Sequence, residues 1–205
     1  MAAVMIVAVV VSQDVWRIGV NNARVVIGTG LALLVLVFAS GMALTEETEP
    51  ARGAELLAPL KKDLKQALMA GMQKSPVHAI SACKDQAPAI TNALAVEGIR
   101  IGRTSHRLRN PGNTAPEWAD IALKTYLSDD TDRAPRVVSL ADNREGYVEP
   151  ITIKPLCLAC HGDNLAPDVA AQIQVMYPED EATGFELDDL RGVYWVEYPA
   201  AMVLE

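Results

Sequence analysis

Two cysteines separated by two residues and followed at once by a histidine, Cys157-Leu-Ala-Cys160-His161, constrain this chain more than any other feature. This is the pattern of covalent haem attachment in c-type cytochromes. Both thiols must reach the vinyl groups of one porphyrin, while the histidine swings under the ring to ligate the iron. We therefore predict one haem c, bound through Cys157 and Cys160, with His161 as an axial ligand.

Two other interpretations of the motif are weaker. A closed structural zinc site usually takes four protein ligands, and only Cys83, His78 and His106 remain to complete one. A thioredoxin-like dithiol favours a strand-to-helix context and does not require the histidine.

The N-terminal region predicts export. Residues 25–43 carry no charge, Arg24 precedes them directly, and Gly41 and Ala43 offer small residues for cleavage. We interpret residues 1–43 as a signal peptide, or as an uncleaved membrane anchor of nearly sufficient length. Residues 44–205 then form one domain in the periplasm, the compartment in which haem c is assembled.

The charge of the chain limits its partners. The net charge is -8 at pH 7, which argues against nucleic acid or anionic lipid as a partner. We expect the protein to contact the membrane only through the possible N-terminal anchor.

A haem iron held by His161 either keeps its sixth coordination position open or takes one more side chain as a ligand there. The candidates are Cys83, His78, His106 and a methionine. Cys83 is the cysteine left over from the motif, and for a free thiol a buried packing role is the ordinary alternative.

Periodicity predicts an α+β fold, in which helices flank an antiparallel sheet. The chain order is two helices, a strand, a helix, two strands, the haem turn, a helix and a last strand. The expected helices cover residues 51–74, 76–98 and 115–127 and a segment around Met176, and the expected strands cover 99–102, 137–140, 147–153 and 192–198.

Arginines gather after the first expected strand, in an acidic protein. Arg100, Arg103, Arg107 and Arg109 fall within ten positions. A planar guanidinium suits the two propionates of haem, so Arg103 and Arg109 are candidate haem-binding residues. A solvated strand face explains the cluster equally well.

Several separate motifs between residues 53 and 198 resemble the exported single-haem c-type cytochrome family with a PAS-like fold, formerly catalogued as a domain of unknown function. These motifs are Cys83 with Ala87-Pro88 and Ile90, Arg103-Thr-Ser105, Leu108-Arg-Asn-Pro111, Asn113, Ala115-Pro116, Trp118, Pro150-Ile151, the Cys157–Gly162 segment, Gly184-Phe185 and Arg191-Gly192. His106 and Asp188 depart from the family, which usually has an apolar residue and a glycine at these positions.

The resemblance implies a PAS-like sheet that cradles one haem c, with His161 and Cys83 as axial ligands of the iron. It also implies a sensor of redox state or of small ligands. A thiolate favours ferric iron, so this ligand pair suggests a switch on reduction that opens a site for a diatomic gas. The alternative is a periplasmic electron-transfer cytochrome with a redox partner protein, and an enzymatic role is not expected.

Overall fold

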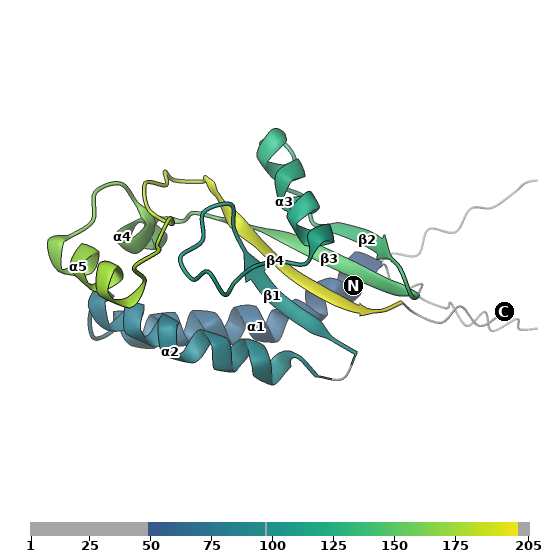
Figure 1. Cartoon of the computed structure of the whole chain (residues 1–205), viewed down its shortest axis with the longest axis horizontal. Coiled ribbons are helices and arrows are strands. Elements are labelled where there is room, and N and C mark those ends of the chain that lie inside the picture. The colour runs from purple at the N-terminus through teal and green to yellow at the C-terminus, as the bar shows by residue number, and fades with distance from the viewer. Residues whose placement is uncertain (1–48, 97, 201–205) are drawn as a thin grey trace, which may run out of the picture. The chain divides into compact units, whose positions relative to one another are not determined.

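The computed structural model describes residues 49–96 and 98–200 (Figure 1). The leader predicted over residues 1–43 lies outside this part of the chain. Within it, no helix combines the length and apolar character needed to cross a membrane. The elements in order are α1 (Glu49–Met72), α2 (Pro76–Leu94), β1 (Arg100–Thr104), α3 (Glu117–Ser128), β2 (Arg136–Leu140), β3 (Arg144–Thr152), the 3-10 turn η1 (Pro155–Cys157), α4 (Leu158–His161), α5 (Pro167–Met176) and β4 (Leu190–Pro199).

Helices α1 and α2 form an antiparallel pair joined by a short turn. Leu57, Leu60 and Leu64 recur at helical spacing on α1 and are buried, as an amphipathic stripe requires. Ser75 caps α2, because its hydroxyl accepts a hydrogen bond from the backbone N–H of His78. Both predicted helices are therefore confirmed, although α2 ends at Leu94 and not at the predicted Gly98; it continues through Pro88.

The sheet has four strands in the order β1-β4-β3-β2, and every pairing is antiparallel. Along β4, Val196 and Tyr198 pack in the core under α1, whereas Val193 and Trp195 pack against α3. Alternation of side chains along a strand explains this division. Helices thus cover both faces of the sheet (Figure 1), which confirms the predicted α+β architecture.

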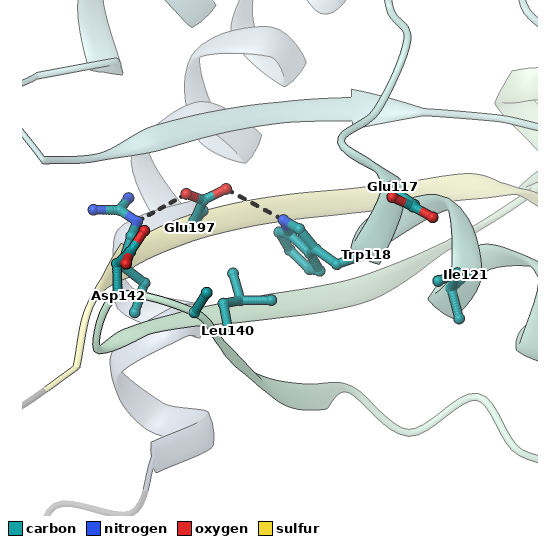
Figure 2. Close-up of a pocket in the computed structure, with 8 residues that line it drawn as sticks. Glu117, Trp118, Ile121, Leu140, Asp142 and Glu197 are labelled. Carbon is teal, nitrogen blue, oxygen red and sulfur yellow. Dashed lines mark hydrogen bonds and ion pairs between the residues drawn. The ribbon is translucent and has the colours of Figure 1, made fainter.

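Helix α3 is held to its face of the sheet by a buried acid. The Glu197 carboxylate accepts bonds from Arg144 Nε at 2.8 Å and from Trp118 Nε1 at 3.2 Å (Figure 2). It also pairs with Arg100 at 2.9 Å. Glu197, Arg144 and Trp118 line a pocket of about 410 Å³, to which Ile121 and Leu140 also contribute. A carboxylate thereby joins α3 to strands β1, β3 and β4.

The segment between β3 and β4 carries α4 and α5 and packs on α2 at one end of the sheet (Figure 1). Val169 and Ile173 of α5 are buried against Ile80 of α2. Gln172 Nε2 donates to Ser81 Oγ across the same contact, at 3.2 Å. Just before β4, Asp188 adopts a positive φ of 65°, so aspartate does take the left-handed geometry for which glycine is usual.

Candidate functional site

The Cys157-Leu-Ala-Cys160-His161 motif forms a tight helical turn made of η1 and α4. Cys157 N–H donates to the Lys154 carbonyl at 2.8 Å, and Gly162 N–H closes the turn on the Leu158 carbonyl at 3.0 Å. Cys157 and Cys160 lie three residues apart on this turn; Cys157 packs beside the cluster that contains Phe185, and Cys160 packs beside the cluster that contains Ile80. Both thiols are free and half-buried.

The His161 ring is oriented by a backbone carbonyl. Its Nδ1 lies 2.7 Å from the Ala182 oxygen. A carbonyl only accepts, so Nδ1 carries the proton and Nε2 keeps its lone pair. Burial, with the charges of Arg109 and Arg191, lowers the pKa of His161 to about 2. The imidazole is therefore neutral, with one nitrogen prepared to ligate a metal.

Two backbone hydrogen bonds hold the 182–185 segment beside the motif. Phe185 N–H donates to the His161 carbonyl and Gly184 N–H to the Gly162 carbonyl, both at 2.9 Å. The buried Phe185 ring meets the His161 ring edge-on, with 6.3 Å between centroids. This pairing keeps the Ala182 carbonyl in place under His161.

Cys83 approaches the motif from α2. Helix α2 contacts α4, and Cys160 packs against a cluster that contains Ile80 of α2. Burial raises the pKa of the Cys160 thiol, and the nearby Cys83 adds to that rise. Burial raises the pKa of Cys83 itself, while Arg103 and Arg109 act in the opposite direction. The same two arginines act on His161. The fold therefore brings Cys83, the motif and both predicted arginines together.

The Arg109 guanidinium is already hydrogen-bonded to other residues of the chain. Its Nε donates to Asp180 Oδ1 at 3.0 Å, in an ion pair whose side chains are 12% and 7% exposed. Its Nη2 reaches Asp180 Oδ2 at 3.2 Å, the Cys160 carbonyl at 2.6 Å and the Ala182 carbonyl at 3.1 Å. Arg109 thus braces the backbone of the motif.

Arg103 is in a different situation. It lies two residues after the buried Ile101 on β1, and so on the same face of the sheet as α1 and α2. Within residues 49–96 and 98–200, no hydrogen bond or ion pair engages its guanidinium. Its charge nevertheless acts on Cys83, His161 and Tyr194. Arg103 is therefore a half-buried cation in the site, available to an anionic ligand.

Arg191 adds a further cation through an irregularity in the sheet. The β3–β4 register shifts between Ile151 and Thr152, so that Arg191 is the extra residue on β4. Such bulges redirect a side chain, and the Arg191 guanidinium donates to the Arg107 carbonyl at 3.1 Å. Burial, followed by the charges of Arg109 and Arg103, lowers the pKa of Arg191 to about 10.

The site consequently has an excess of positive charge. Arg103, Arg109 and Arg191 all act on His161, and Arg103 and Arg109 also act on Arg191. Asp180 forms an ion pair with Arg109. Cations gathered at a partly buried site favour an anionic ligand.

The other candidate ligands lie elsewhere. His78 is exposed at the start of α2, with Nδ1 2.9 Å from Ser75 Oγ. His106 is exposed and meets the edge of the Phe185 ring at 5.8 Å. Met176 packs on the α2–α5 core, and Met69 is 41% exposed on α1.

Two further depressions on the described surface differ from this site. The first is the pocket beside Glu197 in Figure 2, on the α3 face of the sheet. The second, of about 610 Å³, is lined by His106, Arg107 and Phe185 and borders the site from outside. In the described residues, no group of three or more His, Cys, Asp or Glu side chains gathers to hold a metal ion.

Sequence reasoning missed the residues that support His161. Asp180 and the Ala182 carbonyl lie in an irregular segment, where no periodicity marks a role. Arg191 offered a weak signal, a charged residue at the entrance of an aromatic strand. Phe185 and Arg191 stood in motifs of the resemblance, without an assigned contact.

Comparison with known proteins places the chain in one family. The crystal structure of the cyanobacterial haem protein Tll0287 matches with a TM-score of 0.52 and 25% sequence identity, over 74% of this chain and 94% of that chain. Among curated proteins, none matches. The model of the Tll0287-like family matches residues 31–199. The chain therefore belongs to the Tll0287-like family.

Proposed function

We propose that this chain is a periplasmic haem protein that holds one haem c covalently through Cys157 and Cys160. The observation that carries the proposal is that α2, the helix that contains Cys83, packs against α4, the turn that ends in His161. Similarity to a solved haem protein supports it. Two free, half-buried thiols three residues apart on a helical turn fit thioether formation.

The proposed axial ligands are His161 and Cys83. Because Ala182 accepts the Nδ1 proton of His161, the nitrogen left for iron is Nε2. The charges of Arg103 and Arg109 act on both Cys83 and His161, and α2 contacts α4, which supports Cys83 as the second residue that would hold the iron. His78 and His106 are exposed, so neither competes readily in this geometry.

The positive site fits the acidic groups of haem. We propose that Arg103 binds a propionate, because its half-buried guanidinium has no acidic partner in the described residues. Arg109 already donates to Asp180 and to two carbonyls, and therefore has less capacity for a propionate. Its contribution to haem binding is to brace the motif.

A bound haem would supply one-electron redox chemistry, and it could bind a diatomic gas once Cys83 is released. A Cys83 thiolate would favour the ferric state of that iron over the ferrous state. Release of Cys83 on reduction would then convert a redox change into a change at α2. We therefore propose a redox or gas sensor. If His161 and Cys83 both held the iron, no position would be left for a substrate in the resting protein, so we propose a non-enzymatic role.

The antiparallel sheet with helices on both faces supports the PAS-like architecture implied by the sequence resemblance. Export to the periplasm remains a proposal from the sequence of residues 1–43.

The test is spectroscopy of the full chain, expressed in a host that attaches haem c. We expect a thiolate-ligated low-spin ferric spectrum that is lost in Cys83→Ser and retained in the control variants His78→Ala and His106→Ala. Reduction should alter the ligation and admit carbon monoxide.

Three results would contradict parts of this proposal. A colourless protein, or pigment freely extracted by acid acetone, would refute covalent haem. A clearly positive midpoint potential would favour methionine ligation and an electron carrier. Unchanged ligation in both redox states would also favour the electron carrier over the sensor.

A further inference from the structure

The backbone oxygen of Ala182 is shared between two donors. It accepts from His161 Nδ1 at 2.7 Å and from Arg109 Nη2 at 3.1 Å. A carbonyl has two lone pairs, so both bonds form together. However, the second donor withdraws electron density from the oxygen and weakens it as an acceptor for the first. Arg109 therefore acts on His161 without touching it.

Asp180 keeps this arrangement rigid. Its Oδ1 accepts from both Arg109 Nε and the backbone N–H of Ala182, each at 3.0 Å. The acid therefore aligns the guanidinium and the Ala182 peptide on one side chain. Arg109 Nη2 also bonds the Cys160 carbonyl at 2.6 Å, within the motif itself. The Arg109–Asp180 pair thus connects both ends of the His161 environment.

We propose that Arg109 and Asp180 are positioning residues that set the strength of the His161 Nδ1–H···O bond and thereby tune the reduction potential of the bound haem. The inference rests on the proposed function, because it needs iron on His161 Nε2. A stronger Nδ1–H bond makes the imidazole a better donor and favours ferric iron. Arg109 limits that bond, and its positive charge also disfavours the ferric state. Both effects raise the potential.

Two variants separate the two effects. Arg109→Lys keeps the charge but lacks the planar fork that bonds Asp180 and two carbonyls together. Arg109→Leu removes the charge and every donor. We expect both variants to lower the midpoint potential, with Arg109→Lys falling between the wild type and Arg109→Leu.

The control is Arg144→Leu, which breaks the ion pair with Glu197 on the other face of the sheet. It should weaken the fold and leave the potential unchanged. The measurement is a potentiometric titration of the full haem-loaded chain, followed by its absorption spectrum.

Every result decides the question. A wild-type potential in Arg109→Leu overturns the inference. A wild-type potential in Arg109→Lys would mean that Arg109 acts through its charge alone, which overturns the positioning role. This variant remains informative if Arg109→Leu fails to fold. An equal fall in Arg144→Leu would assign the effect to general loosening and would also overturn the inference. A colourless wild type, by contrast, refutes the proposed function itself.

Discussion

Glu197→Gln tests how α3 is held to the sheet, because it keeps the size of the side chain and removes its charge. The carboxylate is 10% exposed and accepts from Arg144 and Trp118. Hydrogen bonds to a charged group contribute about 1.5–3 kcal/mol, and neutral ones about 0.5–1.5 kcal/mol. Losing two charge-assisted bonds should cost about 2–3 kcal/mol of unfolding free energy. The Arg100 side chain is 59% exposed, so solvent screening leaves its pair little to add.

The assay is chemical denaturation, supported by the melting temperature. For a chain of this size, about 2–3 kcal/mol corresponds to a fall in Tm of roughly 5–10 °C. Burial acts to raise the pKa of Glu197, but the bonds from Arg144 and Trp118 and the charge of Arg100 outweigh it and lower the pKa below its ordinary 4.5. The folded pKa is depressed, so this stability is present above pH 4.5 and is lost as pH falls through the folded pKa.

The difference between wild type and Glu197→Gln should therefore shrink in acid. Equal unfolding midpoints at neutral pH would refute the reasoning, as would a difference that grows on acidification. Because Glu197 lies on the α3 face, the haem spectrum of the variant should match the wild type. A spectral change would mean that the two faces are coupled.

Three further perturbations address the site and the sheet. Replacing Cys157 and Cys160 with serine should abolish covalent haem, seen as loss of haem staining on a denaturing gel; retained staining would contradict thioether attachment. Arg103→Ala should weaken haem retention or lower the midpoint potential, since it removes an unpaired cation. No change in either quantity would indicate that Arg103 is only a solvated residue of its strand. Gly102→Ala places a Cβ 2.7 Å from the Trp195 ring and should cost about 1–3 kcal/mol in denaturant titrations; wild-type stability would show that the ring moves aside easily.

Much of the fold was predictable because its signals are local. The leucine stripe of α1 and the Ser75-Pro76 start of α2 depend on neighbours within a few residues, and both predictions are confirmed. The strand at residues 190–199 was expected from its aromatic content, although β4 begins earlier than predicted. Strand order is different, because β4 inserts between β1 and β3 and no local pattern encodes that choice.

The different roles of the arginines could not be predicted from the sequence. Arg103 and Arg109 looked equivalent, six residues apart in one basic stretch. In the structure, Arg109 meets Asp180 and the Ala182 carbonyl, whereas Arg103 has no such partner in the described residues. The partners come from an irregular segment far along the chain, so only the folded backbone could distinguish the two.

The sequence by itself determined which functional groups the site contains, because the spacing of the two thiols and the imidazole is fixed by the covalent chain. The tertiary structure decided what surrounds these groups. Cys83 is contributed by α2, and the Ala182 oxygen accepts the proton that lies on His161 Nδ1. The physical reason is that ligand identity is local, whereas orientation, burial and charge depend on contacts between segments that meet only after folding.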